Sequence, residues 1–82
     1  MEGIPKISSV TALDGLRLRV RFESGRETIY DCTPLLARTA FAPLVNPALF
    51  RTVRVDPGGY GISWNDDIDL SEYELWTNGI AA

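Results

Sequence analysis

The sequence contains no histidine and a single cysteine, and these two scarcities limit the chemistry of the chain. Histidine is the commonest general base and metal ligand, so its absence argues against catalytic triads and zinc sites. Cys32 cannot form an internal disulfide, whereas small secreted chains more often carry several. A lone cysteine is also more often a small buried hydrophobe than a nucleophile. We expect a cytoplasmic protein that is not an enzyme and needs no cofactor.

Long apolar runs are also missing. No segment approaches the roughly 18 apolar residues of a membrane span, and the first residues have no signal-peptide core. A chain of 82 residues is below the usual size for two domains. Its residues are 45% hydrophobic and 23% charged, as in ordinary globular proteins. We therefore expect one globular domain over residues 1–82, with no membrane partner.

Charge is unevenly distributed along the chain, whose net charge is −3. All 8 basic residues precede Asp56, and from Asp56 onward every charged residue is acidic. Two interpretations are open. The acidic segment can pair with the basic strands inside the fold, because opposed charges on neighbouring strands attract. Alternatively, the two signs form separate surface patches, one of which meets a partner.

The most regular segment covers residues 16–22, where apolar and arginine residues alternate strictly. Alternation with period two predicts a strand with one apolar face and one polar face. A second strand is predicted over residues 7–13. The dipeptide Asp14-Gly15 between them suits the positive φ angles of a two-residue hairpin turn. The chain therefore begins with a β-hairpin.

A third strand is predicted over residues 27–31, and the loop at Ser24-Gly25 decides its register. We favour a three-residue loop with Gly25 left-handed, which sets Leu18 opposite Tyr30 and Arg21 opposite Glu27. A two-residue loop would shift every pair by one residue and exchange the two faces.

Two short helices are predicted where a capping residue precedes proline. Thr33-Pro34 and Asn46-Pro47 each combine an N-cap with proline at the first helical position, where the missing N–H costs nothing. The first helix should cover residues 34–38, and the second should make one turn after Pro47.

The end of the chain predicts a third helix. Ser71 lies three residues before Glu74, which is the spacing of a capping box, and Leu70 and Leu75 occupy the positions of a hydrophobic staple. Asn78-Gly79 then supplies a stop.

A second hairpin is predicted between these helices, with strands over residues 52–55 and 60–64 joined through Asp56-Pro57-Gly58-Gly59. The expected fold is α+β: a small antiparallel meander sheet of about five strands with short helices packed on one side. The expected core consists of Val10, Leu18, Val20, Phe22, Leu35, Leu36, Phe50, Val53, Ile62, Trp64, Leu75 and Trp76.

Oxygen-bearing side chains at Asn65, Asp67 and Asp69 suggest a calcium loop. An EF-hand loop needs glycine at its sixth position and glutamate at its twelfth, where this chain has Leu70 and Trp76. We therefore predict no metal site, and interpret the run as a solvated turn leading into the last helix, whose N-terminus favours acids.

The arginine face of residues 16–22 is the candidate partner-binding site. Arg17, Arg19 and Arg21, joined by Arg54 from a neighbouring strand, could hold phosphates or carboxylates bidentately. The alternative is an ordinary polar face of a sheet that is packed on one side only. The acidic net charge and the lack of a basic helix argue against nucleic acid.

The chain also resembles the bacterial domain of unknown function family 2442. The residues that carry the resemblance are Ile7-Ser8-Ser9-Val10, Leu18-Arg19-Val20-Arg21-Phe22-Glu23-Ser24-Gly25, Tyr30-Asp31-Cys32-Thr33-Pro34-Leu35-Leu36, Leu49-Phe50, Val53, Ile62-Ser63-Trp64 and Asp69-Leu70-Ser71. The resemblance implies a small α+β domain, which in longer relatives is sometimes followed by a helix-turn-helix domain. It also implies a gene beside that of another short protein, as in toxin–antitoxin pairs, and no established catalytic residues.

The expected function is a protein-interaction module without catalysis, as the antitoxin-like or regulatory half of a two-gene pair. Its partner would be a second copy or the neighbouring gene product. Because the sequence ends at Ala82 without a helix-turn-helix segment, direct DNA binding is not expected. The alternatives are a nucleic-acid-binding accessory that uses the arginine face, and a small enzyme that uses acidic residues only.

Overall fold

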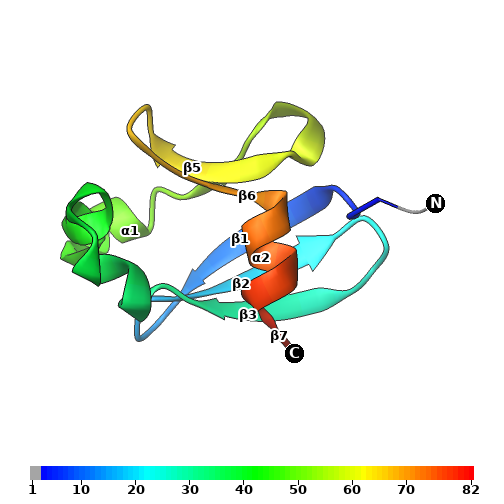
Figure 1. Ribbon diagram of the computed structural model, residues 1–82, viewed down its shortest axis with the longest axis horizontal. Helices are drawn as coiled ribbons and strands as arrows, with labels where there is room; N and C mark the ends of the chain where they lie inside the picture. Colours follow the sequence, from blue (N-terminus) through cyan, green and yellow to red (C-terminus); the bar gives the residue numbers. More distant parts are fainter. Residues whose placement is uncertain (1–2) are drawn as a thin grey trace.

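Three consecutive strands form a meander at the start of the chain, and the end of the chain returns to it as a fourth strand (Figure 1). The computed structural model describes residues 3–82. The order of this first sheet is β1-β2-β3-β7, with every neighbouring pair antiparallel. Its strands are β1 (Ile7–Leu13), β2 (Arg17–Phe22), β3 (Glu27–Asp31) and β7 (Ile80–Ala81).

A second antiparallel sheet, of order β4-β5-β6, lies over the first (Figure 1). Its strands are β4 (Arg54–Val55), β5 (Gly61–Asn65) and β6 (Ile68–Ser71). The short helices are the 3-10 helices η1 (Thr33–Ala37), η2 (Thr39–Val45) and η3 (Pro57–Gly59), and the α-helices α1 (Pro47–Phe50) and α2 (Glu72–Asn78). The predicted α+β class, with antiparallel strands and short helices, is confirmed.

The strand arrangement differs from the predicted meander of about five strands, because residues 3–82 form sheets of four and three strands. The acidic run makes a hairpin instead of leading directly into a helix. The side chain of Asn65 accepts hydrogen bonds from the N–H groups of Asp67 and Ile68, at 2.8 and 3.0 Å, and thereby closes the turn before β6. Strand β7 has two residues, too few to produce an alternating pattern.

The register of the β2–β3 hairpin is the predicted one. Leu18 pairs with Tyr30 and Arg21 pairs with Glu27. The N–H of Phe22 donates to the carbonyl of Arg26 at 2.9 Å, and the loop glycine, Gly25, has a φ of 93°. A glycine without a Cβ adopts this left-handed conformation at little cost.

The β1–β2 turn is longer than predicted. Leu13 pairs with Arg17, so the loop has three residues, and Gly15 and Leu16 both have positive φ, at 76° and 59°. A positive φ is strained for a bulky residue and requires support from its surroundings. The carbonyl of Leu16 accepts a hydrogen bond from the N–H of Cys32 at 2.9 Å, and its side chain packs against the core.

Two of the three predicted helix caps form. The side chain of Asn46 accepts from the N–H of Ala48 at 2.9 Å, and the hydroxyl of Ser71 accepts from the N–H of Glu74 at 3.2 Å. The predicted N-cap at Thr33 is wrong, because Thr33 already lies inside η1. Its N–H instead donates to a carboxylate oxygen of Asp31 at 2.9 Å.

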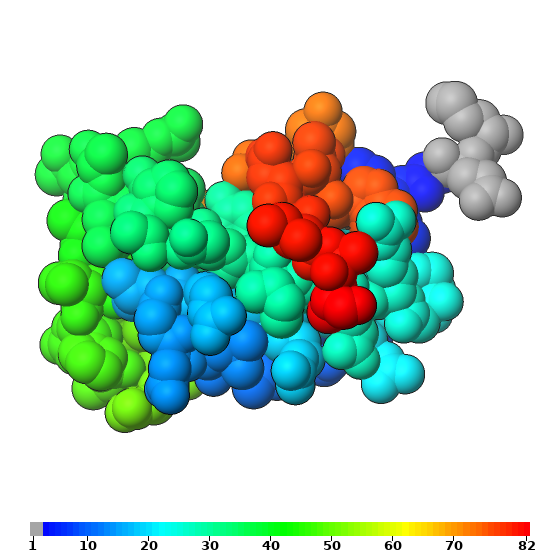
Figure 2. All heavy atoms as spheres, turned by 90° about the horizontal axis from the view of Figure 1, so that it is seen from below, coloured from blue at the N-terminus to red at the C-terminus, as the bar shows by residue number. Residues whose placement is uncertain are grey.

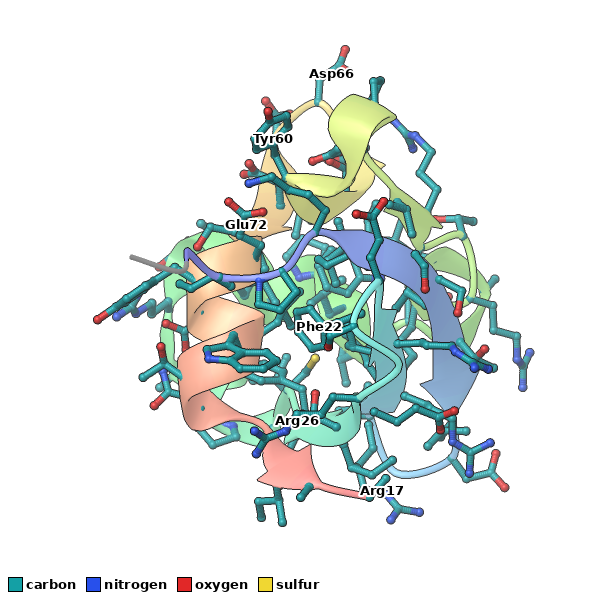
Figure 3. The ribbon with its side chains drawn as sticks, turned by 90° about the vertical axis from the view of Figure 1, so that its right-hand side faces the viewer. Arg17, Phe22, Arg26, Tyr60, Asp66 and Glu72 are labelled. Carbon is teal, nitrogen blue, oxygen red and sulfur yellow. The ribbon has the colours of Figure 1, made fainter. Side chains whose placement is uncertain are left out.

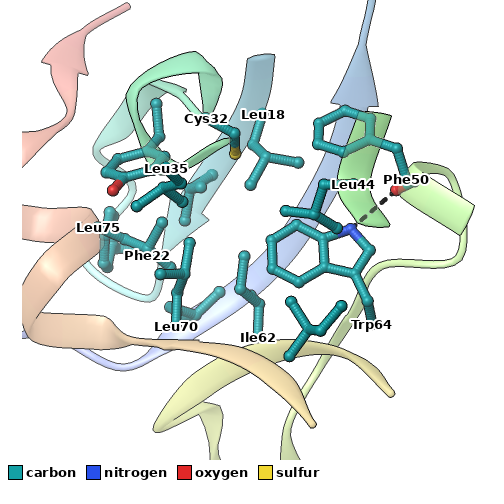
Figure 4. Packing of buried hydrophobic residues seen from close by; sticks show 14 residues of the cluster. Leu18, Phe22, Cys32, Leu35, Leu44, Phe50, Ile62, Trp64, Leu70 and Leu75 are labelled. Atoms are coloured by element: carbon teal, nitrogen blue, oxygen red, sulfur yellow. Dashed lines mark hydrogen bonds between the residues drawn. The ribbon is translucent and has the colours of Figure 1, made fainter. Parts of the chain in front are cut away.

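The core lies between the two sheets and is closed on one side by α2 (Figure 4). The inner face of β2 meets Ile62 and Trp64 of the second sheet, and the indole N–H of Trp64 donates to the carbonyl of Phe50 at 3.0 Å. The buried hydrophobic residues are Ile7, Leu18, Val20, Phe22, Tyr30, Cys32, Leu35, Leu44, Phe50, Ile62, Trp64, Ile68, Leu70 and Leu75. Four predicted core residues are only partly buried, namely Val10, Leu36, Val53 and Trp76.

The two sheets also meet along one edge, where η3 packs on the start of β1. Gly59 has a φ of 76°, and a Cβ at this position would lie 2.6 Å from the carbonyl oxygen of Ile7. Any side chain would therefore push the sheets apart. The N–H of Asp56 donates to the carbonyl of Gly61 at 2.9 Å, which closes the predicted second hairpin.

Candidate functional site

The outer face of the first sheet carries the three arginines of β2, and no element of residues 3–82 covers it (Figure 2). The register of the four strands places residues in rows across this face, because side chains on paired residues point the same way. We call it the outer sheet face, and it consists of Ser9, Thr11 and Leu13 of β1, Arg17, Arg19 and Arg21 of β2, Glu27, Ile29 and Asp31 of β3, and Ile80 of β7.

The arginines on this face have acidic neighbours on β3. Glu27 lies 3.9 Å from the guanidinium of Arg19 and 3.7 Å from that of Arg21. Arg17 is registered with Asp31, and its Nε donates to the carbonyl of Asp14 at 3.1 Å. Exposed ion pairs of this kind contribute at most about 1 kcal/mol each, so the side chains remain available to a partner.

Asp31 is held in its ionised form. Hydrogen bonding from Thr33, first from its backbone N–H and then from its side chain, lowers the pKa of Asp31, and the nearby positive charge of Arg17 adds to this effect. The face therefore combines three guanidinium groups with two carboxylates. It is mixed in sign and not purely basic.

Two isoleucines lie in the middle row of the outer sheet face, beside Arg19. Ile29 is half-buried and pairs with Ile80, which is 75% exposed. Arg19 occupies the same row on β2. Covering such an exposed aliphatic side chain with a partner removes apolar surface from water and so favours binding.

Arg54 does not join the other three arginines. It lies on β4 in the second sheet, in register with Ser63, and its guanidinium donates to the carbonyl of Trp64 at 3.3 Å. Because the neighbours of Ser63 on β5 point into the core, Arg54 points away from it, on the opposite side of the molecule. The predicted grouping of Arg54 with the arginine face is therefore wrong.

The acidic half of the chain is also separate from the outer sheet face. Among residues 3–82, Lys6 and Glu72 form the one ion pair that joins the basic and acidic halves, at 3.2 Å. Asp66, Asp67 and Asp69 are exposed on the β5–β6 hairpin. Figure 3 shows Asp66 and Arg17 at opposite ends of the molecule, so the hairpin and the outer sheet face are distinct charged regions.

A cavity of about 320 Å³ lies at the β1–β2 turn, between the strained Leu16 and Val45, Phe50 and Arg51. A second cavity, of about 360 Å³, lies between β3 and α2. In the second, the hydroxyl of Tyr30 donates to the carboxylate of Glu74 at 2.8 Å. Burial, and then this hydrogen bond, raise the pKa of Tyr30, so its proton stays in place.

Cys32 lines neither of these cavities. Cys32 is fully buried, and burial raises the pKa of its thiol to about 12, so it is an inert core residue as predicted. Residues 3–82 contain no group of three or more acidic, cysteine or histidine side chains that could hold a metal ion. The side-chain oxygen of Asn65 accepts hydrogen bonds that close the β5–β6 turn.

Sequence reasoning identified the arginines but missed the rest of the outer sheet face. The predicted pairing of Arg21 with Glu27 already indicated an acidic neighbour. Asp31 could have been found from the same register. Ile80 could not, because nothing in a two-residue strand distinguishes it from a loop.

These features define a small α+β domain with two antiparallel sheets and an open face of mixed charge. The family model "Protein of unknown function (DUF2442)" matches residues 7–81, and the chain belongs to this family. The comparison with curated proteins gave no match. Within residues 3–82, none of the helices has the length and apolar character needed to cross a membrane.

A solved structure shares the fold. It is the crystal structure of a putative DNA binding protein from Nitrosomonas europaea, with a TM-score of 0.69 and 27% sequence identity. The match covers 82% of this chain and 45% of that one. The chain thus corresponds to less than half of the Nitrosomonas protein.

Proposed function

We propose that this chain is a protein-interaction domain without catalytic activity, and that the outer sheet face is its contact surface. In the cell it would act as the regulatory or antitoxin-like half of a two-gene pair. The observation that carries the proposal is the open sheet face, which presents three guanidinium groups, two carboxylates and the 75% exposed Ile80. Its lone buried cysteine further suits the reducing cytoplasm, where we place the protein.

The mixture of charges favours a protein partner. Nucleic-acid backbones present only negative charge, and Glu27 and Asp31 would meet that charge with repulsion. A protein surface can match both signs at once, which speeds encounter and selects the correct partner. Exposed aliphatic area beside the charges gives such a partner an apolar contact as well.

A nucleic-acid-binding accessory is the second candidate. It is favoured by the likeness to the Nitrosomonas protein, whose name refers to DNA binding, and by the row of guanidinium groups on β2. The two candidates differ in their response to salt. Binding through several phosphate contacts loses affinity steeply between low and physiological salt.

The test combines a pull-down with a DNA-binding assay. The variant Arg17→Glu, Arg19→Glu, Arg21→Glu should slow binding to the protein encoded beside this one, because charges on a contact surface steer association. The matched control is Arg54→Glu, the same change on the other sheet, which should bind like the wild type. Random duplex DNA should not be retained at physiological salt. A wild type that ignores its neighbour but retains DNA under these conditions would reject the interaction domain in favour of the accessory.

A further inference from the structure

The outer sheet face has two parallel rows of opposite charge. The guanidinium row follows β2, and the carboxylate row follows the adjacent strand β3. The register aligns the rows residue by residue: Arg17 is level with Asp31, and Arg21 is level with Glu27. Between these two levels, Arg19 is level with Ile29.

This arrangement is complementary to its own copy. Consider a two-fold axis in the plane of contact, parallel to the strands and midway between β2 and β3. Rotation about this axis places β2 of one copy over β3 of the other and keeps every residue at its level. Arg17 then faces Asp31 of the other copy and Arg21 faces Glu27, and each contact occurs twice. An isologous interface requires this reciprocity.

We propose that the partner of the outer sheet face is a second copy of this chain, bound face to face about such a two-fold axis. The proposal rests on the proposed function, since it names the partner of the same surface. Two sheets packed face to face keep their strand directions within about 30° of each other, which preserves the pairing of rows. At the central level, the same rotation places Ile29 against the aliphatic stem of Arg19 and Ile80 against Thr11 of the other copy.

The charges on the face are free to make these contacts. The carboxylate oxygens of Glu27 lie 3.7 Å from a guanidinium nitrogen of Arg21 and 3.9 Å from one of Arg19. Both distances are longer than that of a good charge-assisted hydrogen bond. Arg17 makes no ion pair with any carboxylate of residues 3–82. A second copy would give Arg17 a carboxylate partner and would give Glu27 a third arginine.

The expected association is weak and reversible. Four strands about 4.8 Å apart and some five residues long present roughly 300 Å² of flat area. Stable dimers usually bury about 1,200–2,000 Å² in total, so a face of this size belongs to the transient class. Charge pairs should then dominate its specificity and its dependence on salt.

A head-to-tail contact is the competing geometry. The exposed acids at Asp66, Asp67 and Asp69 of one copy could meet the arginine row of the next. Such a contact is heterologous and gives open chains or rings instead of a closed dimer. It would leave Glu27, Asp31 and Ile80 uncovered, which is why the two-fold arrangement is favoured.

The test is a charge swap followed by sedimentation analysis at low and physiological salt. The single variants Arg21→Glu and Glu27→Arg each place like charges together at both symmetry-related contacts. Each should weaken dimerisation about tenfold or more. The double variant Arg21→Glu, Glu27→Arg reverses both signs and should restore wild-type association. It also restores opposite charges at positions 21 and 27 within each chain, while Arg19 loses its ion pair with Glu27. Circular dichroism with urea unfolding checks that all variants fold.

Two controls separate the outcomes. Arg54→Glu makes the same charge change on the other sheet and should leave dimerisation unchanged. Asp66→Lys combined with Asp67→Lys should also leave it unchanged, whereas a loss comparable to that of Arg21→Glu would overturn the two-fold geometry in favour of a head-to-tail contact.

A wild type that stays monomeric, or a double variant that does not recover, would overturn self-association. The proposed function has its own readout, the pull-down of the neighbouring gene product. A monomer that still binds that protein through the arginine row therefore rejects only the second copy as partner. A chain that retains DNA and ignores its neighbour rejects the proposed function.

Discussion

The two faces of strand β2 differ in both exposure and charge. On the inner face, Leu18, Val20 and Phe22 are at most 1% exposed and pack against the second sheet. On the outer face, the arginines are exposed, and they contact Glu27 on β3 and the carbonyl of Asp14 in the β1–β2 loop. One strand therefore contributes stability on one side and carries the proposed contact surface on the other. Changes to the two faces should have separable effects.

The largest effect is expected from removing a side chain on the inner face. Leu18→Ala should lower the free energy of unfolding by about 3 kcal/mol, because burial is lost and a cavity remains. Arg19→Ala, one residue along on the outer face, should change it by less than about 0.5 kcal/mol. Urea unfolding of both variants gives the comparison. Equal shifts in the midpoint would show that the outer face is also part of the folded core.

Alkaline pH should lower the free energy of unfolding through a buried group, Cys32. Burial raises the pKa of Cys32 from 9.0 to about 12, so the folded chain keeps the thiol proton while the unfolded chain loses it. Stability from this group is therefore complete below pH 9 and falls as the pH rises toward 12.

The measurable window for Cys32 is narrow. Between pH 9 and about pH 10, the free energy of unfolding should fall by about 1 kcal/mol. Tyr30, whose pKa is also raised by burial, adds a smaller fall as the pH approaches 10, and this contribution is the same in the wild type and in a Cys32 variant. Urea unfolding over this range, compared with the variant Cys32→Ala, isolates the thiol. A wild type and a variant with the same slope against pH would contradict the assignment.

The helix that covers the inner face should depend on its cap. Ser71→Ala removes the hydroxyl that accepts from the N–H of Glu74, and should cost about 1 kcal/mol. Ser8→Ala is the matched control, since the hydroxyl of Ser8 donates to the carbonyl of Arg21 at an exposed position. An unchanged urea midpoint for Ser71→Ala would contradict the role of the cap.

The smallest effect concerns a polar atom on the inner face. Thr28 is fully buried beside Val20, and its hydroxyl has no hydrogen-bond partner within residues 3–82. Thr28→Val keeps the shape, removes the unpaired group, and should leave stability unchanged or raise it by up to about 1 kcal/mol. The reverse change at the neighbouring position, Val20→Thr, should destabilise. A marked loss of stability in Thr28→Val would show that the hydroxyl has a partner.

Local patterns explain why much of the first sheet could be predicted. The alternation of residues 16–22 gave the two faces of β2, and Gly25 gave the loop length that sets the register with β3. The caps at Asn46 and Ser71 are likewise contacts between residues two or three positions apart. Such features depend on a few neighbouring residues, so their signals lie in the sequence.

The second sheet and the composition of the site needed the folded molecule. Strand β6 was hidden because an acidic run is equally suited to a turn or to a helix start, and only pairing with β5 decided the outcome. Leu16 takes a positive φ that leucine avoids, because contacts with Cys32 and the core outweigh its local preference. Arg54 lies on the far sheet for the same reason, since strand order is set by long-range pairing.

The sequence by itself determined which face of β2 is apolar, the register of the β2–β3 hairpin, and that three arginines share one side of β2. Tertiary structure decided that the strands divide into two sheets, that Glu27, Asp31 and Ile80 join those arginines, and that Arg54 and the acidic hairpin do not. The physical reason is the sequence distance over which each interaction acts, because alternation and capping depend on residues a few positions apart. The neighbours across a sheet are chosen by burying the apolar faces of distant segments against each other.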